Sequence, residues 1–330
     1  MLVPEPADHV ERRVARIRDG VWTDAWDTLA AEEPMEIRLR WWEGTQERRE
    51  SIAVTMRTPG DDFELAAGFL HGEGIVTGRD DIVDVSWCLD GLAEGEPQTF
   101  NIVTVTLRPD VPFDIARLDR HFYTTSSCGI CGKATLESLE VRGCDPLPSG
   151  PSVDPAIIQS LPAALRRSQE VFERTGGLHA AGLFDRDGTL LALHEDVGRH
   201  NALDKLIGTQ LLAGNCPLDG CLLLLSGRAS FELLQKALVA RIPVVAAVGA
   251  PSSLAVSLAE SFNMTLLGFV RPDGFNVYTG VERIALSVSS AERGDASDPE
   301  NVFDGLARHA EQEYLSGRTS NLRESLGKGT

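Results

Sequence analysis

This 330-residue sequence lacks the segments that would place it in or across a membrane. No apolar run approaches the roughly 18 residues that a membrane-spanning helix needs. Residues 1–10 have neither the basic nor the apolar region of a secretory signal. Positive charge is scarce as well: the net charge is −18, which argues against a protein that neutralises the phosphates of duplex nucleic acid. We therefore expect a cytoplasmic protein with no membrane and no nucleic-acid partner.

A second cysteine pair is also missing, although one close pair is present at Cys128 and Cys131. A structural zinc site usually takes four ligands from two such pairs, or from a pair and histidines, and only His121 lies near in sequence. A thioredoxin-like redox pair would begin a helix after a strand, whereas 117–123 is a poor strand. Zinc, a redox pair and two unreactive exposed thiols stay open as alternatives to the interpretation that follows.

The cysteine pair lies within Thr-Thr-Ser-Ser-Cys-Gly-Ile-Cys-Gly-Lys at 124–133. Gly129 and Gly132 permit positive φ angles and leave both sulfurs approachable. Lys133 favours the thiolate, which is the form of cysteine that reacts or binds metal. We therefore predict a mobile reactive loop. In this loop Cys128 and Cys131 are the catalytic residues, which pass a group from sulfur to sulfur or from sulfur to metal.

The chain is long enough for two domains with their own cores. Turn residues are concentrated at 145–152, and the pattern of apolar residues changes after Pro155. The predicted organisation is an N-terminal extension at 1–33, an α+β domain at 34–118, the reactive loop and linker at 119–152, an α/β domain at 153–290 and a polar tail at 291–330.

Alternating apolar residues predict strands in the first domain, and Asp61 or Asp62 is a good cap for a helix. Residues 1–33 mix charged and apolar positions, so a short helix at 10–17 and disorder are equally compatible with them. The expected elements of the first domain are strands at 36–42, 51–57, 82–88 and 99–107, a helix at 63–70 and a polar loop at 43–50.

The second domain alternates strands and helices, which predicts right-handed crossovers and a mostly parallel sheet. It opens with a long helix from Pro155 to about Glu173 and a hairpin around the turn at 185–188. A loop at 195–200 then leads into an amphipathic helix. The remaining expected elements are strands at 221–225, 243–248 and 265–270 and helices at 230–241 and 253–262.

Ligands of open α/β sheets bind at the carboxyl ends of the strands, where three loops should meet. Two of these loops lead into helix N-termini, and Arg228 and Arg271 can grip phosphate bidentately. Neither a dinucleotide fingerprint nor a P-loop is present in them. They predict a phosphate-bearing ligand, although ordinary N-caps and solvated arginines would explain the same residues. The candidate binding residues are Ser226, Gly227, Arg228, Phe269, Val270, Arg271, Pro272, Asp273 and Gly274.

Four charged or titratable side chains also lie close together in sequence at the start of the amphipathic helix, namely Glu195, Asp196, Arg199 and His200. They could serve as acid and base groups. A capping carboxylate beside a solvated arginine and histidine is the simpler interpretation, and we prefer it.

Taken together, five motifs in this order resemble the formate dehydrogenase accessory sulfurtransferases, the FdhD family. The resemblance covers residues 34–288. Its most specific piece is Ser-Ser-Cys-Gly-Ile-Cys-Gly at 126–132. The others are Met-Arg-Thr-Pro-Gly at 56–60 with Glu-Leu-Ala-Ala-Gly-Phe-Leu at 64–70, Glu-Asp-Val-Gly-Arg-His-Asn-Ala-Leu-Asp-Lys at 195–205, Leu-Ser-Gly-Arg-Ala-Ser-Phe-Glu at 225–232 and Gly-Ala-Pro-Ser-Ser-Leu-Ala at 249–255.

The resemblance implies a sulfurtransferase that takes sulfur from a cysteine desulfurase as a persulfide on Cys128. It would pass this sulfur to the molybdenum or tungsten of a bis-guanine-dinucleotide pterin cofactor before the cofactor enters formate dehydrogenase. Cys131 would relay the sulfur, reduce the persulfide or support the loop. The cofactor, Mo-bis(molybdopterin guanine dinucleotide), would be a substrate, and the protein would hold no metal of its own.

The resemblance also implies a cytidine-deaminase-like α/β domain and a homodimer. Two other functions stay open. One is a chaperone that protects and delivers the cofactor without handling sulfur, and the other is a zinc-binding interaction module.

Overall fold

A computed structural model describes residues 7–88, 100–111, 144–150 and 152–285. Residues 1–285 cluster into one compact unit, and residues 286–330 form a second unit that lies outside the described ranges. Cys128, Cys131 and the predicted polar tail therefore also lie outside the described residues. No helix in the described ranges is long and apolar enough to cross a membrane.

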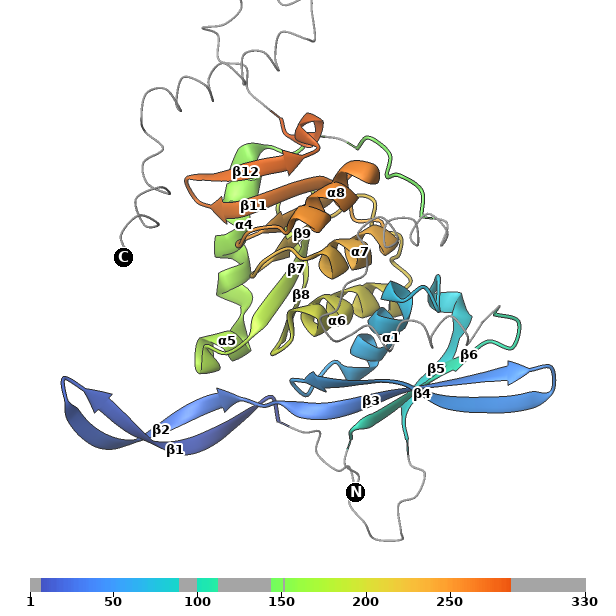
Figure 1. The fold of residues 1–330 in the computed structure, drawn as a ribbon, viewed down its shortest axis with the longest axis horizontal. Coiled ribbons are helices and arrows are strands. Elements are labelled where there is room, and N and C mark those ends of the chain that lie inside the picture. Colours follow the sequence, from blue (N-terminus) through green and yellow to red (C-terminus); the bar gives the residue numbers. More distant parts are fainter. Residues whose placement is uncertain (1–6, 89–99, 112–143, 151, 286–330) are drawn as a thin grey trace, which may run out of the picture. The chain divides into compact units, whose positions relative to one another are not determined.

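The N-terminal extension is a β-hairpin, not the short helix that we considered (Figure 1). Strands β1 (His9–Arg18) and β2 (Val21–Ala30) pair antiparallel. The two residues between them, Asp19 and Gly20, have positive φ angles of 51° and 76°. This Asp-Gly turn is a strong hairpin signal because its twist matches that of the flanking strands. The hairpin corrects the expectation of helix or disorder at 10–17.

A four-stranded sheet in the order β4-β3-β6-β5 follows the hairpin. Residues at alternate positions of β3, including Met35, Ile37 and Leu39, are buried against helix α1. The predicted polar loop at 43–50 is mostly strand, because Gln46–Arg57 continues the pairing and only a two-residue turn remains. The elements are β3 (Glu33–Glu43), β4 (Gln46–Arg57), α1 (Asp62–Gly72), a 3-10 turn (Arg79–Asp81), β5 (Ile82–Trp87) and β6 (Ile102–Leu107).

The second sheet has six strands in the order β12-β11-β10-β9-β7-β8. Only the pairs β9–β10 and β10–β11 are parallel, and the other pairs are antiparallel. The sheet is therefore of mixed orientation, which corrects the mostly parallel prediction: β7–β8 and β11–β12 are antiparallel hairpins, and β7 also runs antiparallel to β9. The strands are β7 (His179–Phe184), β8 (Leu190–Asp196), β9 (Leu222–Leu225), β10 (Val244–Ala247), β11 (Thr265–Arg271) and β12 (Gly274–Thr279).

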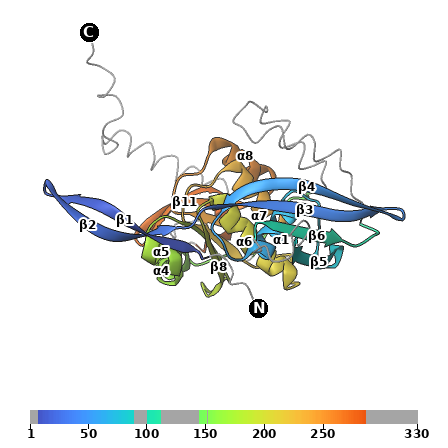
Figure 2. The ribbon, with the colours of Figure 1, turned by 90° about the horizontal axis from the view of Figure 1, so that it is seen from below.

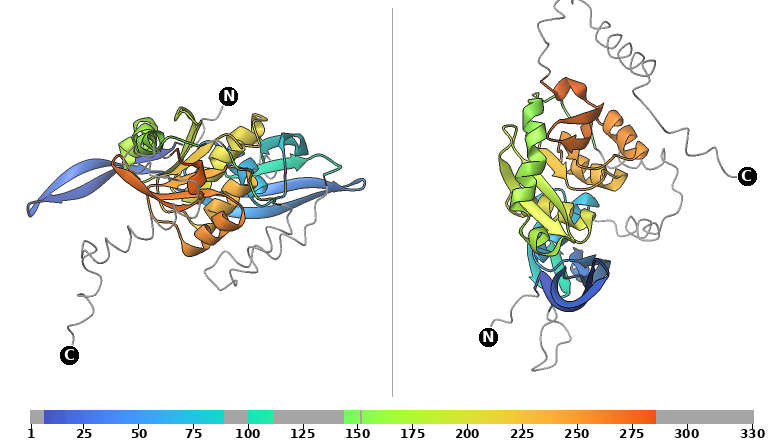
Figure 3. Two further views of the ribbon diagram at one scale, coloured as in Figure 1. Left: turned by 90° about the horizontal axis from the view of Figure 1, so that it is seen from above. Right: turned by 90° about the vertical axis from the view of Figure 1, so that its left-hand side faces the viewer.

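Helices cover both faces of this sheet (Figures 1 and 3). Leu222 and Leu224 of β9 pack with α4, while Leu223 and Leu225 pack with the helices of the other face. Burial on both faces explains why β9 is a continuous apolar run. The helices are α4 (Pro155–Ser168), α5 (Glu170–Thr175), α6 (Arg199–Leu212), α7 (Phe231–Val239) and α8 (Ser253–Ser261), and a 3-10 turn (Val281–Arg283) follows β12.

Helix α1 of the four-stranded sheet packs against α6 of the six-stranded sheet, so the two sheets share one continuous body. The view from below shows α1 and α6 side by side, with β3 and β4 running across them (Figure 2). This contact positions the start of α6, which lies at the carboxyl edge of β9.

Candidate functional site

The three loops at the carboxyl edge of the six-stranded sheet meet, as the sequence predicts. The backbone N–H of Gly249 donates to the carbonyl oxygen of Gly227 (2.8 Å), and that of Phe269 donates to Gly249 (3.2 Å). A Cβ on Gly249 would lie 2.9 Å from the Gly227 oxygen, so only glycine permits this approach. The loops form one surface held by backbone hydrogen bonds.

The candidate binding residues differ in their exposure and in their hydrogen bonds at this surface. Arg228 is exposed. Arg271 is exposed as well, and its Nη1 donates to the carbonyl oxygens of Val248 and Val270 (2.8 Å each), which holds its guanidinium beside the end of β10. The Val270 side chain is fully buried in the core, so only its backbone can reach a ligand. Ser226 and Gly227 follow β9, Phe269 lies in β11, Pro272 and Asp273 form the turn, and Gly274 begins β12.

Phe269 has an unusual backbone for a bulky residue. Its φ is 54°, and 45% of its surface is exposed at the edge that carries Arg271. A large side chain in the left-handed region is strained by about 1–3 kcal/mol, and such strain is concentrated at binding sites. An exposed aromatic ring in this position is available to a ligand.

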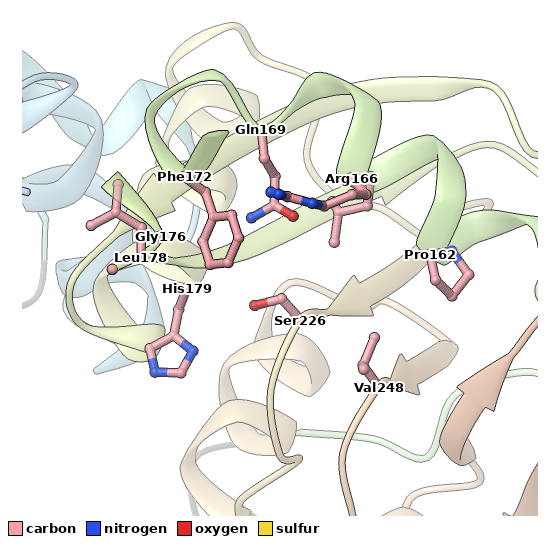
Figure 4. Close-up of a pocket in the computed structure, with 11 residues that line it drawn as sticks. Pro162, Arg166, Gln169, Phe172, Gly176, Leu178, His179, Ser226 and Val248 are labelled. Atoms are coloured by element: carbon pink, nitrogen blue, oxygen red, sulfur yellow. The ribbon is translucent and has the colours of Figure 1, made fainter. Parts of the chain in front are cut away.

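A cleft of about 540 Å³ opens between this edge and helices α4 and α5 (Figure 4). It was not predicted, because its residues come from segments that only the fold brings together. Pro162, Leu165 and Phe172 supply apolar walls, and Gln169, His179 and Ser226 supply polar groups. Ser226 belongs both to the cleft and to the first predicted loop, so the cleft adjoins the predicted phosphate surface.

Glu195 holds the N-terminus of α5, the helix that forms one wall of the cleft. Its two carboxylate oxygens accept hydrogen bonds from the backbone N–H groups of Val171 and Phe172 (2.9 Å each). These bonds cap the first turn of α5, whose backbone N–H groups have no partner within the helix. The guanidinium of Arg166, which also lines the cleft, lies 4.3 Å from the centre of the Phe172 ring and stacks on it.

His179 stands at the mouth of the cleft beside the first loop. Burial, followed by the positive charges of Arg199 and His200, lowers the pKa of this imidazole below its ordinary value. His179 is therefore neutral around pH 7 and can both donate and accept hydrogen bonds. The Ser226 hydroxyl oxygen accepts from the N–H of Ala180 (2.8 Å), which leaves the hydroxyl hydrogen free to donate.

Asp196 is buried among protein contacts, which favours a structural role over the acid–base alternative. The residue is fully buried at the end of β8, where β8 and not a loop holds both Glu195 and Asp196. Its carboxylate pairs with Lys205 Nζ (2.8 Å) and accepts from the backbone N–H of Thr58 (3.1 Å). Thr58 belongs to the motif at 56–60, so this contact joins two of the five motifs across the two sheets.

His200 contacts helix α7 at the same edge. Its Nε2 lies 3.3 Å from the carboxylate of Glu232, and the hydroxyl of Ser230 also donates to that carboxylate (3.1 Å). The hydrogen bond from His200 is the main cause that lowers the pKa of Glu232 to about 2. Glu232 therefore binds His200 and Ser230, although 64% of its side chain is exposed. Arg199, the fourth residue of the sequence cluster, begins α6.

The alternative of ordinary N-caps holds for one of the two helix starts. Ser252 caps α8, since its hydroxyl accepts from the N–H of Ala255 (3.2 Å), whereas Ser230 makes no such bond to α7. In the described ranges no three histidine, cysteine or acidic side chains lie close enough to hold a metal ion. Cys128 and Cys131 are outside those ranges, so the zinc alternative stays untested.

Comparison with known proteins shows to which family this chain belongs. The family described as FdhD/NarQ matches residues 30–285. The chain belongs to this family. The resemblance seen in the five motifs is thereby confirmed, and the match begins near the first residue of β3.

Relatives of known name agree with this assignment. A sulfur carrier protein FdhD of Streptomyces avermitilis is 50% identical over 283 residues, which cover 85% of this chain and 97% of the relative. A protein of the same name from Mycobacterium tuberculosis is 52% identical over 262 residues, covering 78% and 92% of the two chains.

A solved structure from Desulfotalea psychrophila, described as a formate dehydrogenase accessory protein, is 27% identical with a TM-score of 0.62. It covers 84% of this chain, and 99% of that chain is matched. The α/β class is confirmed. The narrower expectation of a cytidine-deaminase-like domain stays a prediction.

Proposed function

We propose that this protein is a cytoplasmic sulfur carrier that matures the cofactor of formate dehydrogenase. It takes persulfide sulfur from a cysteine desulfurase at Cys128 and passes it to the molybdenum or tungsten of a bis-guanine-dinucleotide pterin cofactor. The observation that carries the proposal is the identity of 50% and 52% to proteins named sulfur carriers, over more than three quarters of the chain. The formate dehydrogenase link comes from the accessory protein of similar structure.

The sequence supports the sulfur chemistry. The Cys128 thiolate attacks the terminal sulfur of the donor persulfide. A new S–S bond forms on Cys128 while the donor bond breaks, and the donor cysteine leaves as a thiolate. Lys133 favours the attacking thiolate.

Release of the sulfur as sulfide takes two electrons. A second thiol supplies them by attacking the Cys128 sulfur, so that a disulfide forms and sulfide leaves for the metal. Cys131 is placed in sequence to be that thiol, and a cellular dithiol then restores the pair. Cys131 as a relay or as loop support is the alternative role.

The carboxyl edge supports the cofactor part of the proposal. The exposed Arg228 and the tethered Arg271 offer charge-assisted bonds to phosphate, which suits a dinucleotide. We place the cofactor phosphates on this surface, with Phe269 beside them, and we expect a homodimer as the working form.

A complementation experiment tests the proposal. In cells that lack their own sulfur carrier, the unmodified chain should restore formate dehydrogenase activity, and Cys128→Ala should not. Equal restoration by Cys128→Ala would reject sulfur transfer and favour the chaperone that only protects and delivers the cofactor.

A further inference from the structure

The β1–β2 hairpin carries three large apolar side chains that are mostly exposed. Ile17 is 70% exposed, Trp22 is 60% exposed and Trp26 is 67% exposed. Ile17 lies directly opposite Trp22 in the antiparallel register, and such cross-strand partners share one face of the hairpin. Trp26 lies on this face as well, because it follows Trp22 by four positions in the same strand. We call this face, defined by Ile17, Trp22 and Trp26, the tryptophan face.

The hairpin is attached to the rest of the chain near its base. The carboxylate of Asp8 accepts a hydrogen bond from the guanidinium of Arg174 (3.0 Å), and β2 contacts helix α5. The turn between β1 and β2 extends well beyond α5 in both views (Figures 1 and 2). A two-stranded hairpin is marginally stable in water by itself. A surface that covers the tryptophan face would therefore stabilise the end of the hairpin.

The exposed apolar area is large enough to matter for association. At these exposures the three side chains present on the order of 400 Å², since an aromatic side chain has about 150–250 Å² to bury. Contact between two such faces would bury about 800 Å² before any flanking residue is counted. A specific interface needs about 1,000 Å² in total, so two tryptophan faces with their flanking residues reach that size.

The charges of the two strands are complementary. Strand β1 contains four arginines and one glutamate, whereas β2 contains two aspartates and no lysine or arginine. The whole chain has a net charge of −18, so two copies repel each other unless their shared surface brings opposite charges together. A contact that sets β1 of one copy over β2 of another meets this condition.

One symmetric arrangement gives this contact. A two-fold axis that runs along the hairpin, above the tryptophan face, sets each β1 over the β2 of the partner. Because Ile17 pairs with Trp22 and Arg13 pairs with Trp26 within one hairpin, the same axis places Ile17 on the partner's Trp22. It also places Arg13 on the partner's Trp26, where a guanidinium can stack on the indole ring.

We propose that the tryptophan face binds the same face of a second copy of this chain, in a two-fold contact that sets β1 over β2 of the partner. This inference rests on the homodimer of the proposed function and names the surface that forms it.

Sedimentation equilibrium of the full chain tests the inference. The unmodified protein should be a dimer, and Trp22→Glu should raise the dimer dissociation constant at least about thirtyfold, because buried aromatic residues dominate the affinity of interfaces. Val54→Glu is the matched control: it adds the same charge at another exposed apolar residue, 68% exposed on β4, and should change the constant by no more than about twofold. Circular dichroism checks that each variant folds, and Trp26→Ala replaces Trp22→Glu if that variant does not.

The outcomes separate this inference from the proposed function. Undiminished dimer affinity in Trp22→Glu and Trp26→Ala would overturn the inference and leave the homodimer standing. A monomeric unmodified protein would reject both the inference and the homodimer. If the arm variants stayed dimeric but no longer accepted sulfur from the desulfurase, the tryptophan face would bind the sulfur donor instead of a second copy. Sulfur transfer itself is decided separately, by whether the Cys128 peptide of the unmodified protein gains sulfur.

Discussion

Gly68 of α1 and Gly208 of α6 meet with their backbones in contact. A Cβ on Gly68 would lie 1.9 Å from the carbonyl oxygen of Asp204, and one on Gly208 would lie 1.8 Å from that of Glu64. No side chain fits at either position, so the crossing of these helices depends on both glycines. The crossing ties the four-stranded sheet to the helix that begins at the carboxyl edge.

Gly208→Ala should therefore destabilise the protein strongly. The added methyl group must push two backbones apart, and overpacking of this kind costs about 1–3 kcal/mol or more. Urea unfolding measures the loss. Gly220→Ala is the control, because no atom lies within 4 Å of a Cβ at Gly220 and the change should stay within about 0.5 kcal/mol. Equal midpoints for the two variants would contradict the close crossing.

The buried pair of Asp196 and Lys205 gives a second prediction. Asp196→Asn leaves the Lys205 ammonium without its carboxylate in a site where both side chains are at most 1% exposed. Breaking such a pair costs about 3–5 kcal/mol, and thermal melting should show it. Asp24→Asn is the control, because its partner Arg13 is exposed and the pair is worth no more than about 1 kcal/mol. Similar melting of both variants would show that Asp196 is dispensable.

The third prediction concerns the pH dependence of the contact between His200 and Glu232. The pKa of Glu232 lies at about 2 in the folded protein, below its ordinary value of 4.5. A lowered carboxyl pKa stabilises the fold above the unfolded value, and this contribution is lost as the pH falls from 4.5 to about 2. The stability difference between the unmodified protein and Glu232→Gln should shrink across that window.

Carbon NMR of the labelled Glu232 carboxyl checks the cause directly. His200→Gln should move the titration midpoint upward toward 4.5, because it removes the bond that lowers the pKa. A midpoint that does not respond to His200→Gln would assign the shift to another group.

The two cysteines should differ in their effect on sulfur transfer. Cys131→Ala should slow turnover but still allow Cys128 to accept sulfur, because an accepting thiol needs only its own thiolate. A single-turnover assay with labelled sulfur separates acceptance from release. Complete loss of acceptance in Cys131→Ala would indicate an obligatory two-cysteine relay or a zinc site, and metal analysis would distinguish these.

Several elements could be predicted from the sequence because the signal for each is local. The apolar runs of β9 and β10 and the cap signal of α8 place these elements within about two residues. Helix α1 also begins where predicted, but its predicted cap does not form: the Asp61 carboxylate bonds His194 instead, and that of Asp62 bonds Arg57. The hairpin of β1 and β2 was missed because charged residues interrupt its alternation, although Asp19-Gly20 carried a signal for it. The first half of β4 was predicted as a loop for the same reason, because its residues are mostly polar.

The part of the site that lies on the loops after the parallel strands could be predicted from the sequence. Loop order alone brought Ser226, Arg228 and Arg271 to one edge. Gln169 and His179 could not be found, because nothing in the sequence says that the end of α4 faces the start of β7. The antiparallel pairing of β7 with β9 depends on tertiary contacts that no local pattern shows. It is also a reason why the mostly parallel prediction was wrong.

The central claim is that Cys128 carries sulfur. Mass spectrometry of the protein after incubation with a cysteine desulfurase and cysteine tests it most directly. The account predicts that the peptide containing Cys128 becomes heavier by one sulfur atom, that a reducing thiol reverses the change, and that Cys128→Ala shows no sulfur on any peptide. Sulfur loading that persists in Cys128→Ala, or a Cys128 peptide that never gains sulfur, would contradict the account.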